Sequence, residues 1–565
     1  MKILLVYPYC LEERTRDDDV RVPPIGLYYV GALLFSQGYK VEILNLHGKQ
    51  KETVQIKQVI RDWKPDIIGF SILHANRWGG LEVAGIAKEI DPGIKTVFGG
   101  VGATYLWRHF LEHFEEVDYI VLSEGEYSFL ELVNYLAAGE KEADVPVKGI
   151  AFNQGGKPFK TAEREFIEDI DQLPDPSRYF IFQHVVSSRG CPWNCTFCGS
   201  PGFWKRRVRF HSPEYFVNQL ENLYQKGIDF FYISDDTFTL RKDRVIAICR
   251  DIIRRDLNIS WFAISRVNCV DSDILYWMRK AGCIQISYGV ESGSEYIRES
   301  ILNKQLKVDD IKRAFELTTS YGIMPRAYFI YGSPGENEET IQESLDLMDE
   351  IKPLSAVFYI LDIYPGTALY RDYREKCGIS DDLWLKRIED VMYFETDDSL
   401  DQDMVLNLGK KLREGYYRRL AGYIDSIELV DREELYAAHA DFLARLSLTL
   451  THGDYANIQT IKDKEKTAEN LFRKSLNYYP LERSYLGLGI IKQKNGFYQE
   501  SVNIMSEGLQ YFADSQPLNC CLAISYMNLG RFSDALHLLE KFKESPEVAG
   551  HLDICYKALG LKQGQ

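Results

Sequence analysis

The sequence has no excess of positive charge and no long apolar run. Its 83 acidic and 67 basic side chains give a net charge of −16 at pH 7. No general field therefore attracts phosphates, and we expect no nucleic-acid partner. No stretch approaches the roughly 20 apolar residues that span a bilayer, and the apolar run after Met1 is too short for a signal peptide. We expect no transmembrane segment.

Cysteine is not arranged for disulfides. The 11 cysteines show no regular pairing along the sequence, which indicates a reducing compartment, and we expect a cytoplasmic protein. A chain of 565 residues with 45% hydrophobic side chains has ample material for buried sheets. It is too long for one core and predicts about two to four domains.

Three closely spaced cysteines carry the strongest chemical signal. Cys191, Cys195 and Cys198 have the spacing C-x3-C-x2-C. Three thiolates can hold a [4Fe–4S] cluster and leave one iron open to an outside ligand, which can then receive an electron. The alternatives are a zinc site or three unrelated core cysteines. The next downstream His or Cys is His211, which lies too far away for the usual zinc spacing.

Residues 1–150 alternate short β-branched apolar runs with helix-length segments. The expected strands are 3–7, 41–46, 66–72, 96–100 and 119–122, and the expected helices are 25–36, 54–62, 81–90 and 128–138. This order predicts an α/β, Rossmann-like, doubly wound parallel sheet with ligands at the carboxyl ends of its strands. Residues 151–180 look irregular and are expected to be a linker.

A second series of β/α units begins near Val185. The expected strands are 185–188, 230–234, 260–265, 285–290, 326–331 and 357–363, separated by helices such as 213–226 and 309–321. Six units without closure to eight predict a partial (β/α)6 barrel of the TIM type over residues 181–375. Its chemistry is expected at the C-terminal mouth, where the cysteine loop follows the first strand.

The C-terminal part is expected to be all helical. Residues 376–460 are expected to form a helical extension, and residues 461–565 contain a repeat. The segments that begin at Asn495 and Leu529 align position by position, and a shorter copy ends at Gly560. A period of about 34 residues with a Gly-x-aromatic turn resembles tetratricopeptide helical hairpins. An ordinary helical cap on the barrel is the alternative.

The cysteine motif resembles the signature of the radical S-adenosylmethionine superfamily. The resemblance rests on the three cysteines together with Phe197, which precedes the third of them. It implies a [4Fe–4S] cluster whose open iron is chelated by S-adenosylmethionine, with Phe197 among the contacts of that ligand. Electron transfer then cleaves the ligand to methionine and a 5′-deoxyadenosyl radical. The resemblance also implies an electron donor of the flavodoxin or ferredoxin type.

Later strand ends resemble the segments that hold S-adenosylmethionine in this family. Asp235 stands at the position that meets the ammonium group, and Glu291 stands at the ribose-binding position. Gly332 belongs to a glycine-rich segment that passes along the adenosyl group, where glycine permits close approach. The resemblance implies that Arg266 or Arg326 pairs with the methionine carboxylate.

The first 150 residues resemble the cobalamin-binding domain that precedes the barrel in one large subfamily. Small residues at strand ends let a flat corrin ring and its nucleotide tail lie close to the backbone. The cobalamin contacts that the resemblance implies are Tyr7, Pro24, Gly26, Leu27, Ser71, His74, Gly99, Gly100, Glu124 and Gly125. A mononucleotide- or flavin-binding domain, or one that has lost its ligand, is the alternative.

One motif of other cobalamin enzymes is missing. Mutases and methionine synthases carry Asp-x-His-x-x-Gly after the first strand, whereas the stretch from Asp19 to Gly26 contains no histidine. We therefore expect bound cobalamin to lack that lower ligand, which makes its Co(I)/Co(II) pair easier to reduce. His47 and His74 also lie at strand ends and are the remaining candidates to approach the corrin.

Together these resemblances imply a cobalamin-dependent radical S-adenosylmethionine methyltransferase that places methyl on an unactivated carbon through methylcobalamin and the 5′-deoxyadenosyl radical. The first alternative uses the same cofactors for cyclisation, ring contraction or rearrangement. The second is a scaffold whose C-terminal repeats bind a protein partner. A methylthiotransferase acting on RNA would carry cluster cysteines in its N-terminal domain, and here only Cys10 precedes Cys191. The expected substrate is a small molecule, a lipid or a peptide.

Overall fold

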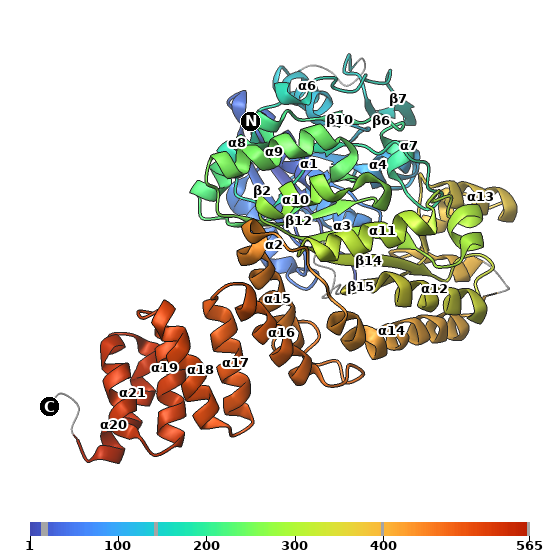
Figure 1. Ribbon diagram of the computed structural model, residues 1–565. Coiled ribbons are helices and arrows are strands. Elements are labelled where there is room, and N and C mark those ends of the chain that lie inside the picture. Colours follow the sequence, from blue (N-terminus) through green and yellow to red (C-terminus); the bar gives the residue numbers. More distant parts are fainter. Residues whose placement is uncertain (13–20, 140–144, 397–399, 562–565) are drawn as a thin grey trace.

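The computed structural model describes residues 1–12, 21–139, 145–396 and 400–561 (Figure 1). A seven-stranded sheet, a six-stranded sheet and a long array of helices follow one another along the chain. The two sheet domains lie together, and α17–α21 project away from them in Figure 1. No helix in the described ranges is both long enough and apolar enough to cross a membrane.

The N-terminal sheet has the strand order β2-β1-β3-β4-β5-β6-β7. Its five parallel strands are β1 (Lys2–Tyr7), β2 (Lys40–Asn45), β3 (Ile67–Ser71), β4 (Lys95–Gly99) and β5 (Tyr119–Val121). The helices between and after them are α1 (Ile25–Ser36), α2 (Thr53–Trp63), α3 (Arg77–Ile90), α4 (Val101–Tyr105), α5 (Trp107–His113) and α6 (Glu126–Ala137). The chain changes direction across the sheet between β1 and β3, which makes the ends of these strands a ligand-binding crevice.

The segment expected to be a linker begins with a β-hairpin. Strand β6 (Ile150–Gln154) pairs antiparallel with β5 and with β7 (Lys157–Lys160). Gly155 and Gly156 make the turn with φ of +59° and +80°, the left-handed conformation that a tight two-residue hairpin needs. The Gly-Gly pair is the sequence signal for this hairpin, and the linker prediction overlooked it.

The central sheet has the order β15-β14-β13-β12-β11-β8, and all of its pairs are parallel. The strands are β8 (His184–Val185), β11 (Phe230–Ile233), β12 (Ser260–Ser265), β13 (Cys283–Glu291), β14 (Met324–Tyr331) and β15 (Ser355–Ile360). The main outer helices are α8 (Pro213–Gln225), α9 (Lys242–Arg254), α10 (Ser272–Lys280), α11 (Val308–Ser320) and α12 (Glu338–Ile351). The sheet is open between β8 and β15 among the described strands, so the expected fold class is confirmed.

The chain after the barrel returns to the N-terminal domain. This segment contains β16 (Asp362–Ile363), α13 (Ala368–Cys377), the short helix η7 (Asp381–Leu385) and β17 (Val391–Met392). Trp384 and Val391 share a hydrophobic core with Phe98 of β4. The buried Arg77 donates to the backbone oxygen of Glu389 at 2.8 Å. We call residues 381–392 the strap, because they bind the barrel to the N-terminal domain.

The described chain after residue 400 is mainly helical. Its α-helices are α14 (Gln402–Asp425), α15 (Tyr436–Thr451), α16 (Lys464–Tyr478), α17 (Glu482–Lys494), α18 (Tyr498–Tyr511), α19 (Gln516–Asn528), α20 (Phe532–Leu539) and α21 (Pro546–Leu559). Helices α14–α16 contribute to the core of the barrel. Consecutive helices from α16 to α21 pack on one another, and Gly496 and Gly530 make equivalent turns with φ of +75°. Membership of the tetratricopeptide family stays a prediction.

Candidate active site

A cavity of about 520 Å³ lies where the strand ends of the N-terminal sheet meet the cysteine loop of the barrel. Eight of the expected cobalamin contacts line it, namely Pro24, Gly26, Leu27, Ser71, Gly99, Gly100, Glu124 and Gly125. The barrel side contributes Cys198, Ser200, Asp236 and Tyr364. One continuous space therefore joins the expected cobalamin surface to the expected cluster loop.

The cavity continues as a slot along the face of the N-terminal sheet. Leu5, Gly69 and Val97 are neighbours on β1, β3 and β4, and all three line the slot. A methyl group on Gly69 would lie 2.9 Å from the side chain of Leu5 and 3.1 Å from that of Phe129. Glycine thus lets Leu5 and Phe129 pack closely over β3, and together these residues give the slot an apolar face.

Two glycines shape the turn that follows β4. The φ of Gly100 is +94°, and a methyl group there would lie 2.8 Å from the backbone oxygen of Ile72. At Gly102 it would lie 2.7 Å from the backbone oxygen of Leu73. Only glycine allows α4 to start this close to the end of β3. Backbone without side chains, at Gly99 and Gly100, therefore lines the cavity at the place expected for the corrin.

No histidine is found among the described residues that line the cavity. His74 contacts Trp384, with ring centroids 4.1 Å apart, and His47 lies at the end of the edge strand β2. Tyr7 is buried and also lies outside the lining. Asp19, where the missing motif would begin, is outside the described residues. The described residues that line the cavity thus fit a cobalamin that has no histidine as its lower ligand.

The backbone around the cysteines is held by a neighbouring loop. Thr196 donates to the backbone oxygens of Leu302 at 3.1 Å and Ile301 at 2.7 Å. Asn303 donates from its side chain to the backbone oxygen of Asn194 at 2.8 Å. These bonds fix the loop between its first and last cysteine, so the positions of the three thiols are set by the barrel.

The three cysteine sulfur atoms are spaced more widely than a single ion would require. Burial raises the pKa of the Cys198 thiol to about 12, and Asp236, Cys195 and Cys191 act in the same direction. In the described chain, the three sulfur atoms do not all lie within 4.8 Å of each other. A tetrahedral zinc ion would need sulfur atoms about 3.8 Å apart, since each Zn–S bond is about 2.3 Å long. The wider spacing fits separate corners of a cluster better than a single ion.

Asp235, the residue expected to meet the ammonium group, lies in the barrel wall, and its neighbour Asp236 lines the cavity. The carboxylate of Asp235 accepts hydrogen bonds from the backbone and side chain of Ser187 and from the side chain of Ser188, each at 2.6 Å. It is 1% exposed and lies in the barrel wall. Asp236 lines the cavity and accepts a hydrogen bond from Ser200 at 2.7 Å. Burial, followed by the charge of Asp235, raises the pKa of Asp236. The position of Asp236 suits the ammonium group better.

Glu291 forms a buried ion pair at the end of β13. Its carboxylate lies 2.6 Å from the ammonium of Lys304, and the two side chains are 6% and 12% exposed. The φ of Glu291 is +67°, which turns the carboxylate back over Gly289, where a methyl group would lie 2.2 Å from it. Lys304 also stands over the ring of Phe197 at 5.8 Å. Glu291 and Phe197 are therefore brought together beside the cysteine loop.

The two candidate arginines are both held by the protein. Arg266 stacks on Trp193 at 4.4 Å and donates to the backbone oxygen of Gln305 at 2.9 Å. It orders the loop that carries the lysine partner of Glu291. Arg326 is the third residue of β14 and donates to Ser355 at 3.0 Å. It therefore lies roughly 16 Å from the end of its strand, too far from the mouth to pair with a carboxylate there.

Gly332 lies directly after β14 with a φ of +79°. Its backbone nitrogen donates to the side chain of Glu336, which also accepts from Ser333 at 3.3 Å. Glu336 is 3% exposed, and burial raises its pKa to about 7. The turn expected to pass along the adenosyl group is therefore braced by a buried carboxyl group that the motif itself does not reveal.

A buried ionic network crosses from the N-terminal domain to the barrel. Arg189 on β9 (Ser188–Arg189) contacts Glu124 at 2.6 Å and Glu126 at 2.7 Å. Arg209 contacts the same Glu124 at 2.8 Å. The side chains are all 7% exposed or less. Glu124, expected to contact cobalamin, thus holds the two domains together, and Arg189 is a site residue that sequence reasoning missed.

The face of the barrel strands away from the helices is aromatic. Phe230, Tyr232 and Phe262 pack edge to face, with centroids between 4.9 and 5.4 Å apart. His184 stacks on Tyr232 at 4.4 Å and lies 3.3 Å from Ser234, which lines the cavity. These rings are half-buried, in contrast to the alternate residues that pack under the helices. An apolar surface therefore extends from the cavity along the barrel wall.

Comparison with known families identifies both halves of the site. Residues 185–348 match the model of the radical SAM superfamily, and residues 18–133 match that of the B12 binding domain. An uncharacterised methyltransferase of Pyrococcus horikoshii is 32% identical over 385 residues, which are 66% of this chain and 82% of that protein. The chain belongs to the cobalamin-dependent radical S-adenosylmethionine enzymes. This family membership confirms the expected [4Fe–4S] cluster, S-adenosylmethionine and cobalamin as its cofactors.

Other members of this enzyme family show similar sequences and folds. The anaerobic magnesium-protoporphyrin IX monomethyl ester cyclase of Rubrivivax gelatinosus is 30% identical over 64% of this chain and 68% of its own. The methyltransferase TsrM of Kitasatospora setae, solved with cobalamin and a [4Fe–4S] cluster, superposes with a TM-score of 0.60 at 15% identity, covering 84% of this chain and 99% of that one. OxsB, solved with aqua-cobalamin and S-adenosylmethionine, gives 0.57 at 18% identity, over 94% and 84%.

Proposed function

We propose that this radical S-adenosylmethionine enzyme is a C-methyltransferase that acts on an unactivated carbon. The observation that carries the proposal is the single cavity that Gly99, Gly100 and Cys198 line together. When bound there, the cluster and S-adenosylmethionine supply a carbon-centred radical, and cobalamin supplies a methyl group. Methyl transfer to a radical needs both groups to face the same substrate carbon, and a shared cavity meets that need.

Asp236 and Arg189 in the cavity lining, and Glu291 beside the cysteine loop, have separate tasks in this proposal. Asp236 binds the ammonium group of S-adenosylmethionine, and Glu291 accepts its ribose hydroxyls. Arg189 keeps the glycine-rich surface opposite the cysteine loop through its pairs with Glu124 and Glu126. Burial of the whole junction excludes water, which would otherwise consume a radical.

An apolar substrate fits the barrel wall. The half-buried rings of Phe230, Tyr232 and Phe262 offer contact area and no charge, so we propose a small molecule or lipid with a flat or aliphatic body. Relatives named hopanoid C-3 methylase and bacteriochlorophyllide d C-8(2)-methyltransferase, at 25% and 21% identity, are in keeping with this class.

The other expectations are proposals of the same kind. We propose residues 1–150 as the cobalamin unit, 181–375 as the radical unit, 376–460 as its helical extension and 461–565 as repeats that bind a protein partner. The electron donor is a flavodoxin or ferredoxin. All 11 cysteines are free of disulfides, which supports a reducing compartment such as the cytoplasm.

Cyclisation is the second candidate, because the relative from Rubrivivax gelatinosus is named a cyclase. The test uses anaerobic, cluster-loaded protein with hydroxocobalamin, S-adenosylmethionine and a low-potential reductant. Formation of 5′-deoxyadenosine and S-adenosylhomocysteine together supports the methyltransferase. Deoxyadenosine alone supports cyclisation or rearrangement. The absence of both products supports a scaffold. Cys195→Ala should abolish the deoxyadenosine, whereas the matched control Cys377→Ala, at an exposed cysteine, should not.

A further inference from the structure

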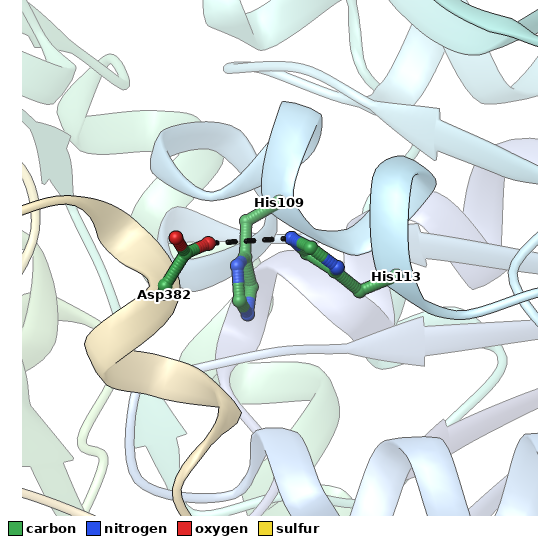
Figure 2. Close-up of side chains that lie close together, drawn as sticks. All are labelled: His109, His113 and Asp382. Carbon is green, nitrogen blue, oxygen red and sulfur yellow. Dashed lines mark ion pairs between the residues drawn. The ribbon is translucent and has the colours of Figure 1, made fainter.

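Two histidines and an aspartate converge outside the cavity, between the N-terminal domain and the strap (Figure 2). His109 and His113 lie one turn apart on α5 and share a face of that helix. Asp382 faces them from η7 in the strap. The ligand atoms of the three side chains all lie within 4.8 Å of one another. No other three His, Cys, Asp or Glu side chains in the described ranges meet this condition.

The spacing in this group suits one metal ion. The Nε2 atom of His113 and the Oδ1 atom of Asp382 are 3.4 Å apart. Two ligands on a tetrahedral zinc ion, each bound at about 2.0–2.1 Å, are separated by about 3.3–3.4 Å. The pair is already at the separation that coordination requires, although it comes from two distant parts of the chain.

The third member, His109, has no other polar partner in the part of the chain that the structure describes. His109 is 4% exposed, and its ring makes no hydrogen bond to a described residue. Its neighbours include the rings of Phe110, Phe114 and His113, with centroids 5.1 to 6.1 Å away. Polar groups in a protein interior normally have a partner, so a ring nitrogen of His109 is available to bind an ion beside the ligand atoms of His113 and Asp382.

We propose that His109, His113 and Asp382 bind a zinc ion, with water in the fourth position. Two imidazole nitrogens and a carboxylate oxygen form a donor set that zinc accepts in tetrahedral geometry. Asp381 does not supply the fourth ligand in this arrangement, because Tyr370 and Arg374 hold its carboxylate at 2.8 and 3.1 Å. His113 and Asp382 have side chains 33% and 67% exposed, so the ion can enter from solvent.

The zinc ion would tie the strap to the cobalamin domain. Helix α5 follows the Gly99–Gly100 turn through α4, so its position helps set the wall of the cavity. Trp384, two residues beyond Asp382, packs on His74 and stacks with Arg77 at 4.8 Å. A metal at the edge of this contact would hold α5 and η7 together more firmly than the His113–Asp382 ion pair alone.

The experiment titrates Zn²⁺ into full-length, cluster-loaded protein under anaerobic conditions, in competition with a chromophoric chelator. We expect one Zn²⁺ per chain beyond the metals of the cluster, and an increase in the thermal midpoint on binding. His113→Ala and Asp382→Asn should weaken binding by at least about 100-fold, because losing a ligand costs more than losing an outer partner. The control His537→Ala, at an exposed histidine on α20, should bind as the wild type does.

Cobalt supplies a second readout, since Co²⁺ with nitrogen and oxygen ligands in a tetrahedral site absorbs visible light. That band should appear in the wild type and be lost in His113→Ala. Wild-type protein that binds no Zn²⁺ beyond its cluster, or variants that bind it equally well, would overturn the proposal. Both substituted side chains reach the surface, so the variants should fold even if His109→Ala does not. The readouts need no S-adenosylmethionine and are separate from the test of the methyltransferase.

Discussion

Arg189 donates to Glu124 at 2.6 Å across the junction of the N-terminal domain and the barrel. Arg189 comes two residues before the first cysteine of the cluster loop, and Glu124 follows β5 at the wall of the cavity. Burial disfavours the charge on the guanidinium, but Glu126 and Glu124 outweigh burial and raise the pKa of Arg189. One ionic contact therefore fixes the distance between the two surfaces that must face the substrate.

The first prediction removes the shared carboxylate of this network. Glu124→Gln leaves the buried guanidinium of Arg209 without its acceptor charge and leaves Arg189 paired with Glu126 alone, and we expect a loss of about 3 kcal/mol in unfolding free energy. The control Glu131→Gln removes the partner of Arg164 at the surface and should cost less than about 1 kcal/mol. Urea unfolding followed by circular dichroism measures both. Equal losses in the two variants would contradict a structural role for the network.

The fold follows from sequence pattern to a large extent because β1–β5 of the first sheet and all strands of the second are parallel. Strands buried on both faces read as short β-branched runs, and the helices between them have helical periodicity. The boundaries of α1 and β12 agree with expectation to the residue. The hairpin at Gly155 and Gly156 was missed because the composition around it is polar, whereas the turn itself had a clear signal.

The site is predictable only where a motif ends on a rigid strand. The cysteines and the Gly99–Gly100 turn lie where the sequence places them, since their neighbours in the chain determine them. Which of Asp235 and Asp236 faces the cavity depends on two serines that follow β8, Ser187 and Ser188. Arg189 is likewise defined by a partner 65 positions away. Contacts between domains leave no periodic trace in a single sequence.

The second prediction fills the cavity from the N-terminal side. A methyl group at Gly26 meets nothing within 4 Å, and Gly26 lines the cavity. Gly26→Leu should weaken cobalamin binding by more than about tenfold, while the better helix propensity of leucine keeps or slightly raises stability. Gly85→Leu on α3 is the matched control, because Gly85 also has open space around it and lies outside the cavity lining. Equilibrium titration with hydroxocobalamin separates the two. Unchanged affinity in Gly26→Leu would place the corrin elsewhere.

The third prediction compares the two adjacent aspartates. Asp236→Asn should lower the rate of 5′-deoxyadenosine formation by more than about tenfold with little change in the thermal midpoint, because its carboxylate faces the cavity. Asp235→Asn should lower the unfolding free energy by about 2 kcal/mol, since its charged acceptor holds three hydrogen bonds in the barrel wall. Product analysis and calorimetry on both variants test this. The opposite pattern would return the binding role to Asp235.

The fourth prediction concerns the pH dependence of stability that Glu336 imposes. Burial raises its pKa from the ordinary value of 4.5 to about 7, so the folded state holds the proton more tightly than the unfolded state does. The resulting stabilisation is fully present below the unfolded pKa. It is lost as the pH rises through the folded pKa, because the buried carboxyl group must then ionise.

Between pH 5.5 and 8, the wild type should therefore lose about 2 kcal/mol of unfolding free energy more than Glu336→Gln, which carries no titrating group there. Urea unfolding of both proteins at the two pH values measures the difference directly. Glu338→Gln is the matched control, because Glu338 is exposed and pairs with Lys411 at the surface, and it should keep the dependence of the wild type. Parallel curves for the wild type and Glu336→Gln would mean that Glu336 is ionised in the folded protein. Its two backbone hydrogen bonds from Gly332 and Ser333 would then outweigh its burial, and the turn beside the adenosyl site would be braced by a charge.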